Sequence, residues 1–209
     1  MIIDKIESTI DEILKYFTEG SFYDTLMDAK KEYISLTGRL TEEDDEYESR
    51  MNCFNNWYLF QREVKEGKTL LQEFSPDKEI VDEEMKLALT QIEHSVYEFS
   101  KVNLKRQIVL KDILHDKKII LSKEQPNIGL VVGDLFTGRL IKYKDEIYFL
   151  KGVCTLPQGI KSILKKQCKK IRKYNNPKEE TAFLLQLESL KTKYLRYGHI
   201  EPSKIFVFS

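Results

Sequence analysis

The chain has 209 residues, of which 41% are hydrophobic and 33% charged, the composition of a soluble globular protein. A chain of this length can bury a core without disulfides or metals. Acidic residues recur through its first segment, which excludes a signal peptide, and no apolar run approaches the ~20 residues of a membrane span. The three cysteines are odd in number and never paired as CxxC, which favours free thiols and a cytoplasmic location. They are Cys53, Cys154 and Cys168.

The formal net charge of zero conceals an asymmetry between the two halves of the chain. Residues 1–100 contain 24 acidic and 11 basic side chains, a net charge of −13. Residues 101–209 contain 10 acidic and 23 basic side chains, a net charge of +13. A basic half can bind nucleic acid or an anionic membrane surface. Alternatively, the halves neutralise each other, within one chain or between copies.

Residues 1–93 are predicted to form an acidic helical region. Apolar side chains recur there at spacings of three and four, as on the buried face of an amphipathic helix. Gly20 and Gly38 are placed to end or interrupt helices. Thr41 and Thr69 are placed to cap the helices that follow them. The predicted helices are residues 2–18, 21–40, 41–60, 69–74 and 76–92, with a turn at 66–68 and Ser75-Pro76 opening the last helix.

Two clusters in this region admit a functional interpretation. The acidic run 42–46 could bind a metal ion, but acidic residues in a first helical turn more simply complement the helix dipole and face water. An aromatic cluster could stack nucleic-acid bases, but aromatic residues three and four apart on a helix more often form core. Both clusters are therefore predicted to be structural. The aromatic cluster comprises Met51, Phe54, Trp57, Tyr58 and Phe60.

Between Val96 and Val153 the pattern changes to period two, with β-branched and aromatic residues separated by turns. Lys144-Asp145 predicts a tight hairpin turn, and Gly133 and Gly138 suit bulges or corners. About five short strands predict a small antiparallel sheet or a barrel of SH3-like or OB-like kind. The predicted strands are residues 96–102, 108–110, 119–121, 140–143 and 147–150.

Helices are predicted to return after Pro157. The first has an apolar seam and a lysine-rich surface, and Asn175-Asn176-Pro177 closes it. The last helix is predicted from apolar residues spaced four, three, four and three, and Gly198 ends it. Residues 205–208 are predicted to add a terminal strand to the sheet. The seam of the first helix consists of Ile160, Ile163, Leu164 and Ile171. That of the last helix consists of Phe183, Leu187, Leu190, Tyr194 and Tyr197.

No catalytic, metal-binding or cofactor-binding motif is predicted. Cys154 is the best-placed candidate nucleophile, but a small buried side chain explains it more simply. Asp112 and Asp134 lie beside turns, where a turn hydrogen bond accounts for them. The segment GDLFTG matches neither the phosphate loop nor GxGxxG. The histidines lack ligand-like spacing, which disfavours zinc. They are His94, His115 and His199.

The basic helix after Pro157 carries the clearest functional signal. Its cations would form a positive stripe able to contact nucleic-acid phosphates without reading sequence. The same helix could lie on an anionic membrane, although its seam is narrow and lacks Trp and Phe. The third possibility is that the seam packs on the β region while the lysines are solvated or face the acidic half. The candidate nucleic-acid-binding residues are Lys161, Lys165, Lys166, Lys169, Lys170, Arg172 and Lys173.

Most of the chain beyond residue 45 carries, in order, the stretches FNNWYLFQR, GKTLLQEF, SVYEFSKV, GDLFTGRLIKYKDEIYFLKG and FLLQLESLKTKYLRYGHIEPSKIF. In these stretches the chain resembles a family of uncharacterised proteins from predatory and gliding bacteria. The resemblance implies one continuous architecture. It implies no activity and no catalytic residue.

Together these patterns predict an α+β protein with an acidic helical region over 1–93 and a β region with basic C-terminal helices over 94–209. The first functional hypothesis is a non-catalytic protein that binds DNA or RNA through the basic helix. The alternative is an interaction or scaffold subunit, a homo-oligomer or a partner-binding protein, whose acidic and basic halves mediate association. Neither hypothesis requires a cofactor, a metal or a membrane.

Overall fold

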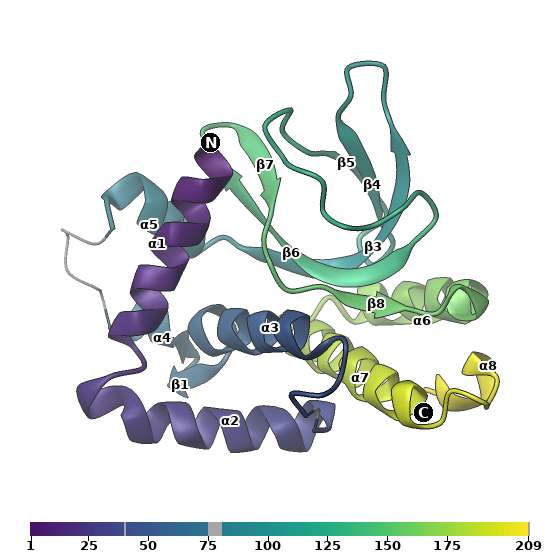
Figure 1. Cartoon of the computed structure of the whole chain (residues 1–209), viewed down its shortest axis with the longest axis horizontal. Coiled ribbons are helices and arrows are strands. Elements are labelled where there is room, and N and C mark those ends of the chain that lie inside the picture. Colours follow the sequence, from purple (N-terminus) through teal and green to yellow (C-terminus); the bar gives the residue numbers. More distant parts are fainter. Residues whose placement is uncertain (40, 75–80, 209) are drawn as a thin grey trace.

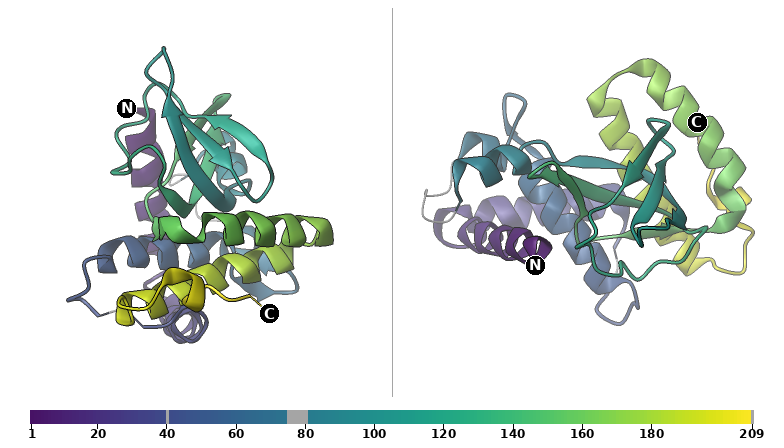
Figure 2. Two further views of the ribbon diagram at one scale, coloured as in Figure 1. Left: turned by 90° about the vertical axis from the view of Figure 1, so that its right-hand side faces the viewer. Right: turned by 90° about the horizontal axis from the view of Figure 1, so that it is seen from above.

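A computed structural model describes residues 1–39, 41–74 and 81–208. A curled antiparallel sheet lies against helices from both ends of the chain (Figure 1). The predicted α+β class, with an N-terminal helical region, a small antiparallel sheet and C-terminal helices, is confirmed. Figure 2 shows the sheet stacked above helices α6 (Lys161–Tyr174) and α7 (Pro177–Arg196).

The N-terminal helices form where the apolar periodicity predicted them. Four isoleucines on one face of α1 are buried, because they recur at helical spacing and pack against β-sheet and helix side chains. The sheet contributes Ile141, Tyr143 and Tyr148 to the same apolar cluster. The helices are α1 (Ile2–Tyr16), η1 (Gly20–Phe22), α2 (Tyr23–Thr37), α3 (Tyr47–Phe60), α4 (Leu70–Glu73) and α5 (Glu83–Leu89).

The start of the third helix differs from the prediction. Residues 42–46 form turns, and α3 begins at Tyr47 rather than at Thr41. The Asp44 carboxylate accepts hydrogen bonds from the backbone N–H of Thr41 at 2.6 Å and from its hydroxyl at 3.1 Å. Asp44 thus stabilises a local turn, which competes with helix at this position.

A short β-hairpin interrupts the region predicted to be wholly helical. Strands β1 (Glu63–Lys65) and β2 (Lys68–Thr69) flank the predicted turn at 66–68. Glu66 and Gly67 both have positive φ, +42° and +80°, as tight hairpin turns require. The predicted cap at Thr69 is confirmed, since its backbone N–H donates to Gln72 Oε1 at 2.9 Å.

The predicted opening of the next helix at Ser75-Pro76 lies outside the described residues. In the described part, α5 is capped by Asp82, whose Oδ1 accepts a hydrogen bond from Met85 N–H at 2.8 Å.

Over the described residues, the sheet has six strands: five in the order β5-β4-β3-β6-β7, with β8 paired to the free edge at the start of β6. All pairings are antiparallel. The predicted hairpin turn at Lys144-Asp145 is confirmed, with φ of +50° and +61°. Strand β8 was not predicted from the sequence. The strands are β3 (Glu93–Val102), β4 (Ile108–Asp112), β5 (Lys117–Ile120), β6 (Leu135–Tyr143), β7 (Glu146–Phe149) and β8 (Cys154–Leu156).

The sheet curls into a half-barrel, and the chain after β5 bridges its open side. Ser122 N–H donates to the Ile147 carbonyl at 2.8 Å, and Phe149 N–H donates to Gln125 Oε1 at 2.7 Å. The interior is apolar, which explains the period-two pattern of the strands. It is filled by Tyr97, Phe99, Leu110, Ile119, Leu121, Phe136, Leu140 and Phe149.

The predicted bulge at Gly138 is wrong. Gly138 pairs in regular register with Ser95, and the irregularity lies in β3, between Phe99 and Lys101. A Cβ atom at Gly138 would lie 2.5 Å from Cζ of Phe149. Glycine is therefore required here because an aromatic ring of the interior covers its α-carbon.

Another glycine sets how closely the sheet approaches α3. Gly152 has a φ of +93°, and a Cβ atom there would lie 2.8 Å from the backbone nitrogen of Cys53. Gly152 therefore combines a left-handed conformation with direct backbone-to-backbone packing.

The C-terminal region packs on the other side of the sheet through a second apolar cluster, which includes Val96, Leu164 and Phe183. The predicted terminal strand at 205–208 is wrong. Helix α8 (Pro202–Ile205) occupies its start, and the chain that follows is irregular, with Phe206 buried. A hydrophobic run this short can fill a core without joining the sheet. The remaining element is η2 (Gln158–Ile160).

Candidate nucleic-acid interface

Helix α6 is held against the protein by its apolar seam. Leu164, Cys168 and Ile171 are buried at helical spacing in the cluster that joins β3, β8 and α7. Asn175, in the left-handed conformation at φ +47°, ends the helix. Asn176 then caps α7, because its Oδ1 accepts a hydrogen bond from Lys178 N–H at 3.0 Å. The predicted end of the basic helix at this junction is confirmed.

The surface opposite this seam is a lysine face. Its residues are exposed, and none has an ion-pair partner among the residues that the structure describes. They form two adjacent rows at i, i+4 spacing and span about 12 Å along the helix axis. The lysine face consists of Lys165, Lys166, Lys169, Lys170 and Lys173.

Two of the seven predicted binding residues make contacts within the protein. Lys161 pairs with Glu98 of β3 at 2.7 Å. Arg172 donates to the backbone carbonyl of Leu114 at 2.7 Å and lies 3.6 Å from Asp116. Both side chains extend toward the sheet, which leaves the other five as the exposed group.

Among the described residues, none of the acidic side chains of residues 1–100 pairs with the lysine face. The lysines of the basic half that pair with the acidic half are others: Lys161 with Glu98 at 2.7 Å, Lys151 with Asp11 at 4.0 Å, Lys178 with Glu63 at 2.9 Å and Lys191 with Glu46 at 2.7 Å. Helix α7 packs between α6 and α2, so the face lies at the periphery of the molecule (Figure 2).

The membrane interpretation of the basic helix meets an obstacle in the packing. An interfacial helix inserts its apolar face between lipids. In α6 that face, with Leu164 and Cys168 fully buried, contacts the rest of the protein. Over the described residues, none of the helices combines the length and apolar character that crossing a bilayer requires.

A polar cluster that the sequence did not reveal surrounds His115, in the turn between β4 and β5. The buried Asp112 carboxylate accepts hydrogen bonds from His115 Nδ1 at 2.9 Å, from His115 backbone N–H at 2.9 Å and from the Ser95 hydroxyl at 2.6 Å. His115 Nε2 lies 3.2 Å from Glu180 of α7. The predicted turn role of Asp112 is confirmed, and the cluster ties the sheet to the start of α7.

The same cluster has the composition of a catalytic triad but not its geometry. In a triad the serine hydroxyl donates to one imidazole nitrogen while the carboxylate holds the other. Here Ser95 donates to Asp112 and lies near Nδ1, the nitrogen that Asp112 already holds, at 3.3 Å. The hydroxyl is also buried. The cluster therefore has no activated nucleophile.

The pH dependence of stability tests this cluster. The hydrogen bond that His115 donates to the Asp112 carboxylate, and then the neighbouring Glu180 carboxylate, raise the pKa of His115 above its ordinary value of 6.5. The imidazolium therefore stabilises the fold fully below pH 6.5, and this contribution is lost as the pH rises through the elevated pKa. In denaturant titrations, the free energy of unfolding of wild type should exceed that of His115→Gln by more at pH 6 than at pH 9. Equal differences in the free energy of unfolding at the two pH values would contradict this expectation.

Arg139 of β6 is fully buried and has no carboxylate within ion-pair distance among the described residues. Its Nε donates to Gln61 Oε1 at 3.1 Å, and its Nη2 donates to the same oxygen. Gln61 directly follows α3, so the guanidinium lies near the negative end of that helix dipole. The adjacent His94 has a pKa lowered by burial and by Arg139, which keeps its ring neutral.

The thiols are buried and unreactive in this fold. Cys53, Cys154 and Cys168 are free, and burial raises the pKa of the latter two to about 12. The prediction that Cys154 is a small buried side chain is confirmed. In the part of the chain that the structure describes, no three or more His, Cys, Asp or Glu side chains are arranged to hold a metal ion.

Sequence reasoning missed a buried ion pair between α3 and α7. Arg50 Nη1 lies 2.7 Å from Glu188 Oε2, and Arg50 Nη2 donates to Thr192 Oγ1 at 2.9 Å. Tyr33 of α2 also donates its hydroxyl to Glu188 Oε2. The sequence signal that could have revealed this ion pair is Glu188, a charged residue that directly follows Leu187 of the apolar seam of α7.

The fold and the lysine face define the class of this molecule: an α+β protein with a half-barrel sheet that presents an exposed basic helix. The chain belongs to a family of unknown function, DUF7986, whose model matches residues 5–185 and so includes all of α6. This confirms the predicted membership of an uncharacterised family. Comparisons with curated proteins and with solved structures give no match.

Proposed function

We propose that this protein binds nucleic acid through the lysine face of α6. One observation carries the proposal: five exposed lysines share one side of a helix, and the residues described around them supply no counter-ion. Ammonium groups at this density favour a polyanion, because each phosphate contact releases condensed counter-ions. One exposed aromatic side chain, Tyr174, follows Lys166 and Lys170 at i, i+4 spacing, so most contacts are to the backbone and at most one base stacks on the helix.

Such binding is independent of sequence and sensitive to salt. With up to five phosphate contacts, the logarithm of the association constant should fall with the logarithm of salt concentration with a slope no steeper than roughly −4.5 on duplex DNA. The buried seam and the pairing of Lys161 with Glu98 fix the helix before it meets its ligand. No loop needs to become ordered, which limits the entropy lost on binding.

Charge reversal tests the proposal. We expect the Glu substitutions of Lys165, Lys166, Lys169 and Lys170 to weaken binding to a labelled duplex or single-stranded RNA by at least about tenfold at low salt, and to flatten the salt slope. Fluorescence anisotropy at several salt concentrations measures both effects. The matched control reverses four exposed lysines scattered elsewhere, Lys15, Lys105, Lys118 and Lys123, with the same change in net charge.

The proposal fails if binding ignores salt, if it survives reversal of the α6 lysines, or if the control variant loses as much affinity. Sedimentation of the protein alone tests the interaction hypothesis. Self-association that disappears in high salt, together with no affinity for DNA or RNA, would assign the lysine face to a protein partner or a second copy instead.

A further inference from the structure

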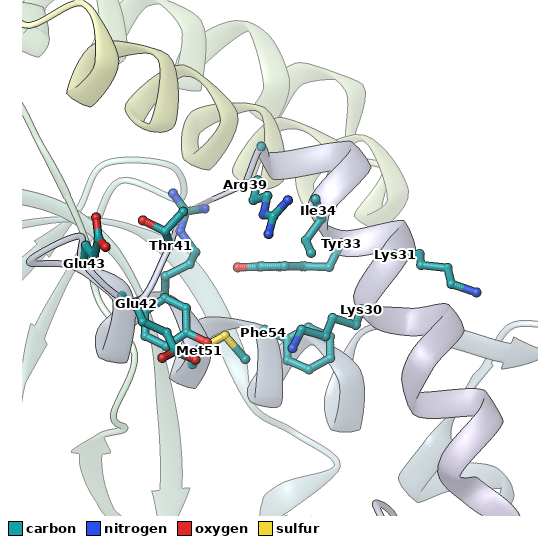
Figure 3. Close-up of a pocket in the computed structure, with 13 residues that line it drawn as sticks. Lys30, Lys31, Tyr33, Ile34, Arg39, Thr41, Glu42, Glu43, Met51 and Phe54 are labelled. Carbon is teal, nitrogen blue, oxygen red and sulfur yellow. The ribbon is translucent and has the colours of Figure 1, made fainter.

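Three rings of the aromatic cluster of α3 are buried and offer no face to a nucleic-acid base. Phe54, Trp57 and Tyr58 are at most 4% exposed. A cavity of about 780 Å³ lies between α2, the chain that follows it and the first half of α3 (Figure 3). Its rings, Tyr33 and Phe54, are buried as well, so the cavity presents no aromatic surface for stacking. A base that stacks on this protein needs a ring elsewhere.

Tyr174, the last residue of α6, is exposed and continues one row of the lysine face. Lys166, Lys170 and Tyr174 follow one another at i, i+4 spacing, about 6 Å apart along the helix axis and on one side of the helix. Tyr174 is 52% exposed and makes no hydrogen bond or ring contact with the residues that the structure describes. Because α6 runs along an edge of the molecule, a nucleic-acid strand has access to this row (Figure 2).

The order of the side chains in this row matches the two parts of a nucleotide. Side chains of a helix lean toward its N-terminus, which directs the Tyr174 ring back over the turn that carries Lys170. The Lys170 ammonium is suited to a phosphate, and the ring beside it is suited to the base of the same or the next nucleotide. Lys166, one turn earlier, is suited to a neighbouring phosphate of the same strand.

The ring is useful only to a nucleic acid with unpaired bases. In a duplex each base is paired and stacked between its neighbours, and it reaches a protein ring only if it is flipped out. In a single strand a base turns outward at little cost. The lysines alone favour a duplex, because its two strands carry about twice the negative charge per unit length. Tyr174 therefore acts against the preference that charge alone would give.

We propose that Tyr174 makes the lysine face selective for single-stranded nucleic acid, by stacking on one unpaired base while Lys166 and Lys170 pair with adjoining phosphates. This inference rests on the proposed function, since the phosphate contacts of α6 hold the strand beside the ring. Every base has a face that can stack, so the selectivity is for strandedness and not for sequence. Single-stranded DNA and RNA share this chemistry.

Substitution of Tyr174 tests the proposal at constant charge. Fluorescence anisotropy compares the affinities of wild type, Tyr174→Leu and Tyr174→Phe for labelled oligo(dT), oligo(rU) and a duplex of equal length. Tyr174→Leu should weaken binding to at least one of the single strands by at least about fivefold, the lower end of the effect of stacking one base. Its affinity for the duplex should change less than about twofold, because the backbone contacts remain. Tyr174→Phe keeps the ring and should stay within about twofold of wild type on every probe.

The salt dependence distinguishes stacking from charge. Tyr174→Leu removes no cation, so its affinity for the single strand should fall equally at all salt concentrations, whereas the Glu substitutions of the α6 lysines flatten the salt slope. Tyr23→Leu is the matched control and should leave every affinity unchanged. Tyr23 is 56% exposed, but it lies in the acidic region, next to Asp24 at the start of α2.

Tyr174→Trp gives a direct signal of stacking. Its added indole should lose fluorescence on binding oligo(dT) or oligo(rU) and not on binding the duplex. Wild type supplies the background, because its one tryptophan, Trp57, is buried in the N-terminal cluster.

The inference and the proposed function fail in different ways. If Tyr174→Leu loses no more affinity for the single strands than for the duplex, Tyr174 does not select single strands. The inference is then wrong, and the proposed function still stands if reversal of the α6 lysines weakens binding to both. If wild type binds none of the three probes, both are wrong.

Discussion

Replacing Arg50 with methionine is expected to lower the free energy of unfolding by about 3–5 kcal/mol, the cost of leaving one charge of a buried pair alone. Methionine has a comparable length, so the cavity term is small. Glu188 is fully buried, and its second oxygen, Oε1, already has no hydrogen-bond partner among the described residues. Without Arg50 it would keep only the Tyr33 hydroxyl as a donor to its side chain. Urea denaturation of both proteins at pH 7 measures the difference.

A double variant distinguishes the loss of the Arg50–Glu188 contact from the cost of leaving the Glu188 carboxylate buried without a partner. If the cost arises from the uncompensated carboxylate, Arg50→Met with Glu188→Met should be more stable than Arg50→Met alone, because neither charge is then buried. A loss below about 1 kcal/mol for Arg50→Met would show instead that Glu188 becomes protonated or reaches water at little cost.

Gly152→Ala is expected to destabilise the protein by about 2–6 kcal/mol, the sum of two separate penalties. Backbone strain at a positive φ costs about 1–3 kcal/mol for a residue with a Cβ atom. Forcing that atom into a packed contact costs about 1–3 kcal/mol more. The contact is with the backbone of Cys53 and Asn52, which cannot rotate away as a side chain could.

Gly133→Ala is the matched control for this substitution. Gly133 has a φ of +101°, close to the +93° of Gly152, but no atom within 4 Å of its added Cβ. It should therefore show the strain penalty alone. Equal losses for Gly133→Ala and Gly152→Ala in thermal and urea unfolding would mean that the sheet and α3 separate easily at this point.

Most of the fold follows from periodicity and turn chemistry. The amphipathic pattern of α1 and the positive-φ turn at Lys144-Asp145 depend on near neighbours in the chain, so they could be predicted. Strand β8 could not, because its three residues form a strand only by pairing with β6. The C-terminal segment was misassigned for the same reason: Phe206 is apolar, but its burial depends on α7.

The same distinction applies to the candidate sites: features within one helix could be predicted, and contacts between distant segments could not. The lysine face was predictable because the seam and the lysines belong to one helix. The roles of Lys161 and Arg172 were not, since Glu98 and the Leu114 carbonyl come from distant strands and turns. The cavity beside Tyr33 was hidden from sequence reasoning, because residues 42–46 were predicted to be helical and instead form turns along its rim.

The rates at which the three free cysteines are alkylated can report local unfolding of the protein. Cys53 lies in the apolar cluster of the N-terminal helices, whereas Cys154 and Cys168 lie in the cluster beneath α6 and α7. A thiol this deeply buried is alkylated only when its surroundings open, so labelling rates followed by mass spectrometry measure local unfolding. One wild-type sample can thus show whether the two clusters open together or separately, with no label introduced.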